Sequence, residues 1–210
     1  HGYSEGPSIK SIEEQGKWVS DAMDAVTMKE ASLVGHSQGC LITLECASQF
    51  PNKVRSLALM GGAGAIPMNP ELLELAEKGD PKAVDLMMDW AHGPAGHFGG
   101  HAVPGLHHIN IGGTIIINGS VKDALGVDFR ACDNYKNGFE AAKKIKCPTI
   151  NILGDKDRMC PVKEGKKLAD SIKSSEIVII ENCGHMILLE EADKALAILK
   201  KFIRNHHPSK

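Results

Sequence analysis

The sequence lacks the features of several large classes of protein. It carries 24 Lys and Arg against 26 Asp and Glu in 210 residues, so it has no basic surplus that would favour nucleic acid or an anionic membrane. No apolar run approaches the roughly 20 residues that a membrane-spanning helix needs. The six cysteines form no C-x-x-C pair, which argues against a zinc ribbon or a thioredoxin-like motif. We therefore expect no nucleic-acid partner and no membrane partner.

The cysteines and the start of the chain bear on location. Free thiols in a reducing compartment are the simplest interpretation of six cysteines without a pairing pattern. No secretory leader is visible, and this favours a cytoplasmic protein. The sequence begins at His1 rather than at Met, in the Gly-rich stretch of residues 1–7. We therefore also expect a longer N-terminus upstream of this sequence.

Predicted strands and helices alternate along much of the chain. Short apolar runs predict strands, and residues with helical spacing between them predict helices. The expected strands cover residues 31–35, 54–60, 148–153 and 176–180, and the expected helices cover residues 8–28, 38–50, 161–171 and 188–205. Such alternation predicts an α/β fold, with a mostly parallel sheet that has helices on both faces.

The alternation stops in the middle of the chain. Residues 65–129 predict two helices, near 69–78 and 80–91, each opened by a proline in its first turn. A further helix is expected over 130–144. We interpret 65–129 as a helical cap inserted into a core made of 1–64 and 130–210. The apolar residues of 80–91 either pack against the core or line a pocket for a small to medium apolar substrate group.

Five histidines cluster in the Gly-rich stretch that follows the second cap helix: His92, His97, His101, His107 and His108. No cysteine or carboxylate shares a regular spacing with them, as a metal site would require. We therefore expect no metal here, and no cofactor anywhere in the chain.

The strongest chemical motif is Gly35-His36-Ser37-Gln38-Gly39, which fits G-x-S-x-G. It stands between a predicted strand and a predicted helix, where a nucleophile elbow is built. The two glycines allow a tight turn that exposes Ser37 at the strand end, and the backbone N–H of Gln38 faces a developing oxyanion. A purely structural glycine turn is the alternative.

A serine nucleophile needs a base and an acid. His185 follows the last predicted strand, and Asp155 and Asp157 follow the strand before it. The carboxyl ends of parallel strands share one edge of a sheet, so these residues are expected near Ser37. We favour Asp157 over Asp155 as the acid that holds the imidazole. The order Ser, Asp, His is the one expected for this architecture.

These motifs together resemble the α/β-hydrolase superfamily. The matching segments are residues 35–39, 153–158 with Pro161, and 184–191, while residues 1–6 look like the loop after the fourth strand of that family. The resemblance implies that Ser37 is the nucleophile, Asp157 the acid, His185 the base and Gln38 an oxyanion donor. It implies a hydrolase for a small ester-like substrate, of carboxylesterase type, and does not specify the substrate.

The sequence departs from that family at its N-terminal end. The first strands of the family would precede His1, and one of their loops supplies the second oxyanion donor. Losing such a donor lowers the rate by about 10²–10³. Without those strands, the strand at 31–35 becomes a sheet edge with unpaired backbone groups. We expect upstream residues, a second copy of the chain or another chain to cover it.

Two hypotheses follow from these observations. The first is a serine esterase that acts through an acyl-enzyme on Ser37. The second is a non-catalytic hydrolase-fold module, which binds a partner through the edge at 31–35 and retains Ser37, Asp157 and His185 as relics. Reaction of Ser37 with an acylating or phosphonylating probe distinguishes the two.

Overall fold

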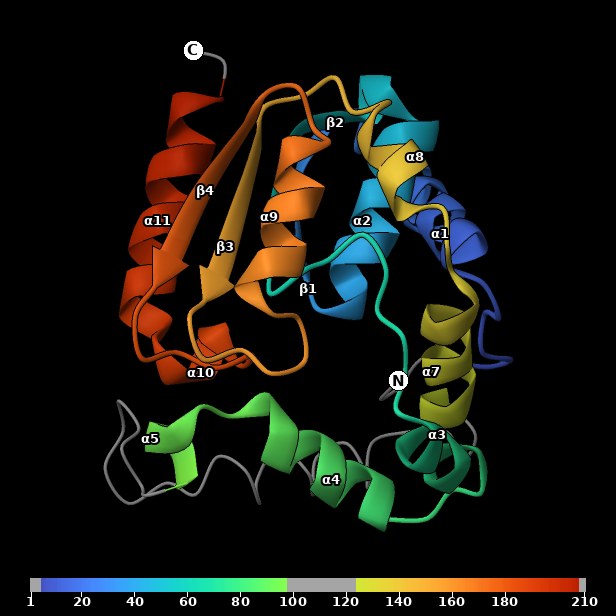
Figure 1. Ribbon diagram of the computed structural model, residues 1–210. Coiled ribbons are helices and arrows are strands. Elements are labelled where there is room, and N and C mark those ends of the chain that lie inside the picture. Colours follow the sequence, from blue (N-terminus) through green and yellow to red (C-terminus); the bar gives the residue numbers. More distant parts are fainter. Residues whose placement is uncertain (1–4, 98–123, 208–210) are drawn as a thin grey trace.

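A four-stranded parallel sheet forms the centre of the described molecule (Figure 1). The computed structural model describes residues 5–97 and 124–207. The strands stand in the order β1-β2-β3-β4, and each neighbouring pair is parallel. Their bounds are β1 (Ala31–His36), β2 (Val54–Met60), β3 (Thr149–Gly154) and β4 (Ser175–Ile180). The predicted parallel sheet is therefore confirmed.

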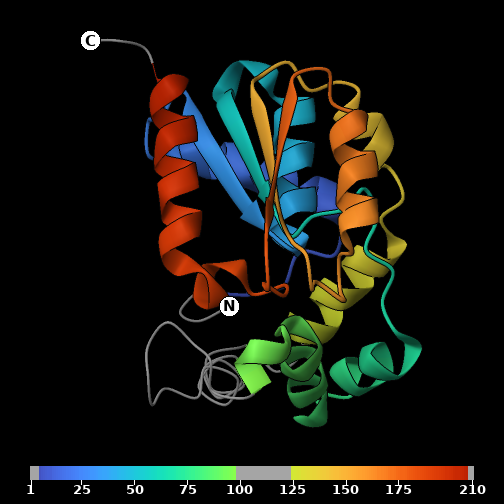
Figure 2. The same ribbon diagram turned by 60° about the vertical axis from the view of Figure 1, so that its left-hand side comes forward.

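Helices cover both faces of the sheet (Figure 2). One face carries α1 (Ile12–Ala25), α2 (Gln38–Gln49), α8 (Gly138–Ala142) and α9 (Val162–Asp170). The other face carries α11 (Ala192–Asn205), which follows the short helix α10 (Ile187–Glu190). A 3₁₀ turn, η1 (Pro51–Lys53), joins α2 to β2.

The alternation of side chains along β2 divides the core into two layers. Leu57 and Leu59 pack on the side of α2 and α9, in a cluster with Leu44. Ala58 and Met60 pack on the side of α11, in a cluster with Phe202 and others. Since neighbouring residues of a strand face opposite sides, an apolar run such as β2 is what a sheet buried on both faces requires.

The helix expected over residues 8–28 is shorter in the structure, where α1 runs from Ile12 to Ala25. Ser11 is the N-cap, and its hydroxyl oxygen accepts a hydrogen bond from the Glu14 backbone N–H at 3.2 Å. Ile12 and Met23 are buried, as the helical spacing predicts. Val26, which lies within the range expected to be helical, is the C-cap that follows Ala25 and is 65% exposed.

Four of the described helices lie beyond the carboxyl ends of the strands (Figure 1). They are α3 (Pro70–Glu77), α4 (Lys82–Ala91), α5 (Pro94–His97) and α7 (Ala124–Asn134). Asn69 caps α3 by accepting hydrogen bonds from the N–H groups of Glu71 and Leu72. The division into a cap at 65–129 and a core stays a prediction, since it includes residues 98–123, outside the described ranges.

The prediction of a single helix over residues 130–144 is wrong. The structure has α7 and α8 there, with residues 135–137 between them. Tyr135 is buried and donates a hydrogen bond to Glu45 at 2.6 Å, which fixes the end of α7 against α2. A Cβ at Gly138 would overlap the backbone of Gly64. Tertiary contacts on both sides of the break thus override the helical spacing.

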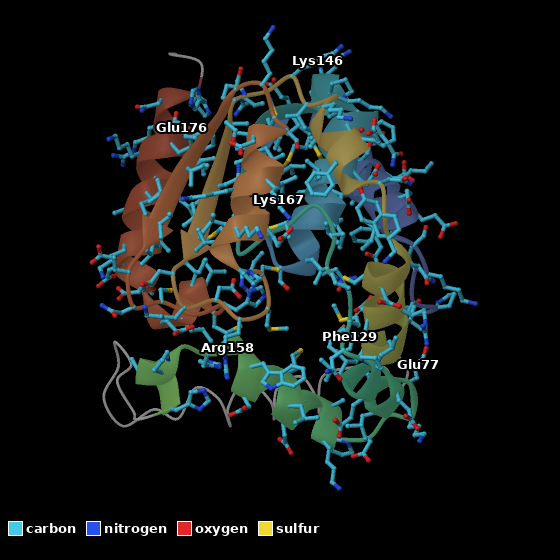
Figure 3. All side chains as sticks on the ribbon, in the orientation of Figure 1. Glu77, Phe129, Lys146, Arg158, Lys167 and Glu176 are labelled. Carbon is cyan, nitrogen blue, oxygen red and sulfur yellow. The ribbon has the colours of Figure 1, made fainter. Side chains whose placement is uncertain are left out.

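Apolar side chains of α4 pack within this layer of helices. Val84 and Met88 are buried, and Phe129 of α7 belongs to a cluster with Leu72 and others of α3 (Figure 3). Packing is therefore the use that the structure shows for these residues. Arg158, which follows β3, donates a hydrogen bond to the Asp89 backbone carbonyl oxygen at 2.8 Å and ties α4 to the sheet edge (Figure 3).

Candidate active site

Ser37 lies at a strained turn between β1 and α2. Its backbone has φ 55° and ψ −123°, in the left-handed half of conformational space that a serine seldom adopts. Such a residue stores roughly 1–3 kcal/mol of strain. Ser37 occupies the N-cap position of α2, yet its side chain makes no capping hydrogen bond. The hydroxyl is thus left available in a place where a serine would ordinarily cap the helix.

The two glycines of the motif have different roles. A Cβ at Gly35 would lie 2.5 Å from Thr43 Oγ1 and would overlap the Gly39 backbone, so only glycine fits there. A Cβ at Gly39 would meet nothing within 4 Å among the described residues. Among the described residues, steric crowding therefore requires glycine at position 35 and not at position 39.

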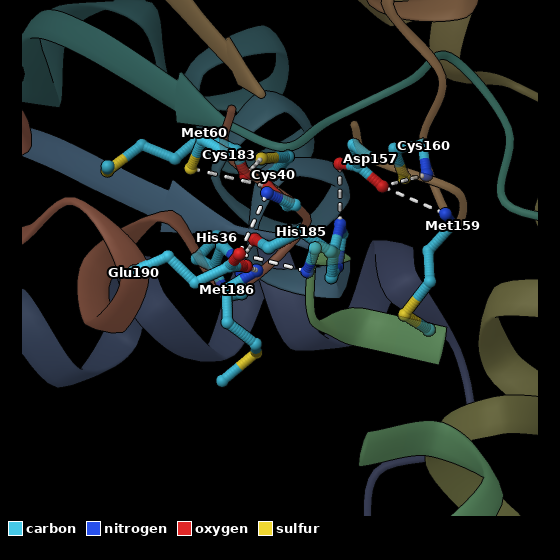
Figure 4. Close-up of polar contacts among 12 residues, drawn as sticks. His36, Cys40, Met60, Asp157, Met159, Cys160, Cys183, His185, Met186 and Glu190 are labelled. Carbon is cyan, nitrogen blue, oxygen red and sulfur yellow. Dashed lines mark hydrogen bonds and ion pairs between the residues drawn. The ribbon is translucent and has the colours of Figure 1, made fainter. Parts of the chain in front are cut away.

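Asp157 and His185 form a buried pair at the same edge of the sheet (Figure 4). His185 Nδ1 lies 2.8 Å from Asp157 Oδ2, and both side chains are almost fully buried. Because a carboxylate only accepts hydrogen bonds, Nδ1 carries the proton and donates it. Nε2 of the neutral ring then has a free lone pair. This atom is buried and has no hydrogen-bond partner among the described residues.

The loop after β3 holds the Asp157 carboxylate in place. Its Oδ1 accepts hydrogen bonds from the N–H groups of Met159 at 2.8 Å and Cys160 at 2.7 Å, while Oδ2 is left for His185 (Figure 4). Asp155 has other partners: it accepts from the Cys183 N–H and pairs with Lys156. The structure brings Asp157, and not Asp155, to the imidazole.

The backbone of His185 is held at both ends. Its N–H donates to the carbonyl oxygen of Ala91, the last residue of α4, at 2.8 Å. Its carbonyl oxygen accepts from Nε2 of His36 at 2.7 Å, and the two rings lie 4.9 Å apart (Figure 4). Gly61 makes room for the pair, since a Cβ there would lie 3.1 Å from His185 Nδ1.

His36 is neutral over most of the pH range. Burial, and after it the nearby His185, lower the pKa of His36 to about 4. A neutral ring that donates from Nε2 keeps its proton on that nitrogen. The sequence placed His36 in the elbow but did not predict its bond to His185, because 149 residues separate the two.

Gln38 follows Ser37 as the first residue of α2. Backbone N–H groups of the first helical turn have no acceptor within the helix, so that of Gln38 is free to face an oxyanion. The side chain is held away from this role, donating to Gln15 Oε1 at 3.2 Å and to the Asp128 carbonyl oxygen at 3.4 Å. Among the described residues no hydrogen bond links Ser37 to His185, a bond that in free enzymes often forms only with substrate.

The six cysteines are free, and five of them are buried. Burial raises the pKa of Cys40 and Cys132 to about 12, and that of Cys160 well above its usual value. The thiolate is the reactive form of cysteine, and these groups stay protonated near neutral pH. These buried thiols are therefore weak nucleophiles near neutral pH.

A cavity of about 580 Å³ lies between the loop after β3 and the α4–α5 region. The described residues that line it are Asp89, His92, Pro94, His97, Asp155, Lys156, Asp157 and Arg158. The sequence offered an apolar lining from α4 as one possibility, but the apolar side chains of that helix pack inward. Gln38 lines a second cavity, of about 610 Å³, with Trp18 and Asp128.

The histidine stretch shows no metal geometry in the part that is described. His92 is buried, and its Nδ1 interacts with the Met88 carbonyl oxygen at 2.8 Å. His97 lies near Asp89. Within residues 5–97 and 124–207 no group of three metal-ligating side chains is found. His101, His107 and His108 lie outside the described residues, as does the start of the 1–6 segment.

Comparison with known proteins identifies the fold. The family model described as alpha/beta hydrolase fold matches residues 1–96. A solved structure described as that of a thermophilic esterase superposes with a TM-score of 0.80 and 28% identity, over 98% of this chain and 77% of its own. This chain has the fold of the α/β-hydrolase superfamily.

Relatives within the superfamily are hydrolases. The 2-hydroxymuconate semialdehyde hydrolase of Pseudomonas sp. (strain CF600) is 26% identical over 96% of this chain and 72% of its own length. A pimeloyl-[acyl-carrier protein] methyl ester esterase of Neisseria meningitidis (strain FAM18) is 27% identical over 88% of this chain and 73% of its own. The chain is thus an α/β-hydrolase. None of its helices in the described ranges has the length and apolar character to cross a bilayer.

Proposed function

We propose that the chain hydrolyses a carboxylic ester or a related acyl bond of a small molecule through an acyl-enzyme on Ser37. The observation that carries the proposal is the buried Asp157–His185 pair, whose Nε2 atom has a free lone pair and no partner among the described residues. A strained serine, whose side chain makes no capping hydrogen bond, follows β1 at the same edge of the parallel sheet. A base with an oriented imidazole next to a nucleophile is the arrangement that acyl transfer requires.

The reaction follows from these groups. Ser37 Oγ attacks the carbonyl carbon as its proton passes to His185 Nε2, and the Gln38 N–H donates to the oxygen that gains charge. The imidazolium is stabilised by Asp157 and returns the proton to the leaving group, which departs as an alcohol. Water then attacks the acyl-enzyme with the same proton transfers, releasing the acid and regenerating Ser37.

The names of the relatives guide the choice of substrate. One is named a methyl ester esterase and another a semialdehyde hydrolase. We propose an oxygen ester as the first substrate class to test, with methyl and p-nitrophenyl esters of short acids. Each of these forms the same acyl-enzyme with a different leaving group.

The decisive experiment uses a fluorophosphonate, which phosphonylates an activated serine. We expect one adduct on the wild-type chain and none on Ser37→Ala. Ser174→Ala is the matched control, because Ser174 is an exposed serine remote in sequence from the elbow, and it should be labelled like the wild type. Ester turnover by Ser37→Ala at the wild-type rate would contradict the proposal.

A second proposal concerns the edge of the sheet at β1. Among the described residues β1 pairs only with β2, and Val34 on it is 44% exposed. We propose that a second copy or another chain covers this edge, as unpaired apolar edges favour. Light scattering should show an assembly that Val34→Lys weakens. A wild-type monomer at all concentrations would contradict this second proposal. Assembly without any labelling of Ser37 would favour the non-catalytic module.

A further inference from the structure

The Glu190 carboxylate lies between the His185 loop and the junction of α4 and α5. Its Oε2 accepts hydrogen bonds from the N–H groups of Gly93 at 2.9 Å and Gly184 at 3.0 Å. Its Oε1 accepts from the Met186 N–H at 3.2 Å (Figure 4). One carboxylate thus binds three backbone donors from two segments that are about 90 residues apart in sequence.

The backbone approaches so closely here that two of these positions admit only glycine. A Cβ at Gly93 would lie 2.8 Å from Glu190 Oε2 and 2.9 Å from the Gly184 nitrogen. A Cβ at Gly184 would overlap the Gly93 nitrogen. The junction after α4 and the loop after β4 are therefore packed backbone to backbone, with the Glu190 side chain closing the contact.

The residues on both sides of His185 in the chain take part in this contact. Gly184 and Met186, the neighbours of His185, both donate to Glu190. The N–H groups of His185 and Met186 also donate to the carbonyl oxygen of Ala91 at the end of α4. The position of the imidazole is thus set by hydrogen bonds that α4 and Glu190 make to the backbone of its loop.

We propose that Glu190 is a positioning residue for His185, which couples the α4–α5 segment to the base. The inference rests on the proposed function. Hydrogen bonds to an ionised acceptor are about twice as strong as neutral ones, and a carboxylate can accept all of them together. An amide at this position replaces one acceptor oxygen with an NH₂ group that opposes a backbone N–H donor. The loop then shifts, and Nε2 loses its alignment with Ser37.

Glu190→Gln tests this role, with Glu191→Gln as the matched control. Glu191 is the next residue and pairs with Lys194 at the surface, so its replacement removes the same charge without touching the loop. The measurements are kcat and KM for a p-nitrophenyl ester, the fluorophosphonate labelling rate, and unfolding by urea. For Glu190→Gln we expect kcat and the labelling rate to fall about 10- to 100-fold with KM within about twofold. The control should stay within about twofold of the wild type.

A second variant keeps the proposal testable even if Glu190→Gln does not fold. Gly93→Ala pushes the junction away from Oε2 while the carboxylate remains, and it should lower kcat in the same direction. In the double variant the two losses should combine to less than their product, because both disrupt one contact. If Glu190→Gln does not fold, the kcat and KM of Gly93→Ala decide the matter.

The outcomes separate this inference from the proposed function. A wild-type chain that takes no label overturns the proposed function, and the role of Glu190 with it. A labelled wild type together with folded Glu190→Gln and Gly93→Ala variants of unchanged kcat overturns the role of Glu190 alone. The role of Glu190 is also overturned if the loss of kcat in the variant is no larger than the fraction of variant protein that is unfolded, as urea unfolding measures it. A residue that only stabilises the fold would give that result.

Discussion

The His36 ring donates a hydrogen bond from Nε2 to the carbonyl oxygen of His185 at 2.7 Å. The residue before the candidate nucleophile therefore holds the backbone of the candidate base. Asp157 fixes the His185 ring at Nδ1, and Ala91 fixes its backbone N–H. Three separate segments thus determine where a single free nitrogen, Nε2, is placed.

Stability should fall in mild acid because of His36. Its pKa is lowered to about 4 in the folded chain, whereas a histidine in the unfolded chain titrates near its ordinary value of 6.5. Between these pH values the unfolded state binds more protons, so the free energy of unfolding falls as the pH falls from about 6.5 to 4. The size of this contribution is about 3 kcal/mol.

His36→Gln checks this pH dependence by urea unfolding at a series of pH values. The glutamine amide can still donate to the His185 carbonyl oxygen but does not titrate. We expect the stability difference between wild type and variant to change by about 3 kcal/mol between pH 7 and pH 4. If the free energy of unfolding changed with pH in the same way for both proteins, His36 would not be the group that causes the loss of stability in acid.

Asp157→Asn should abolish most of the activity while Asp155→Asn retains it. An asparagine at 157 can present its NH₂ group to Nδ1, which favours the tautomer with the proton on Nε2 and removes the free lone pair. The expected loss in kcat is about 10³–10⁴-fold. Asp155 contacts Cys183 and Lys156 instead, so its variant is the control. An equal loss in both would argue against the assignment of Asp157.

Replacement by alanine should lower the free energy of unfolding at Gly35 but not at Gly39. A methyl group at Gly35 meets Thr43 Oγ1 and the Gly39 backbone, an overpacking that costs about 2 kcal/mol or more. At Gly39 the space is open and the residue is helical, so alanine should raise the free energy of unfolding by up to about 1 kcal/mol. Urea unfolding of the two single variants measures both. A strongly destabilised Gly39→Ala would mean that its surroundings are filled in solution.

Cys147 should be the first thiol to react with iodoacetamide. It is the one partly exposed cysteine in the described structure, whereas the other five are buried. Burial raises the pKa of Cys147 too, so the reaction should be slow near pH 7 and faster as the pH rises. Intact-mass spectra over time should show one adduct, and further adducts only in denaturant. Rapid modification of Cys40 or Cys160 in the folded chain would contradict the burial described here.

Local patterns predicted the elements well where the chain itself sets them. The short apolar run of 54–60 becomes β2 with the bounds expected, and the helix expected over 8–28 contains α1. Prediction failed where distant contacts decide the backbone. The break between α7 and α8 depends on Tyr135 reaching Glu45 and on the close approach of Gly138 to Gly64. These partners are 90 and about 74 residues apart, beyond the range of a local pattern.

The candidate site shows the same division. The sequence by itself determined the strand–turn–helix around Ser37 and the edge of the sheet at which Asp157 and His185 emerge, because strand periodicity and glycine sterics act over a few residues. Only the tertiary structure decided between Asp157 and Asp155, joined His36 to the His185 carbonyl, and brought Gly93 to Glu190. The physical reason is that a hydrogen bond depends on a distance of about 3 Å between atoms, and loops from separate strands set that distance.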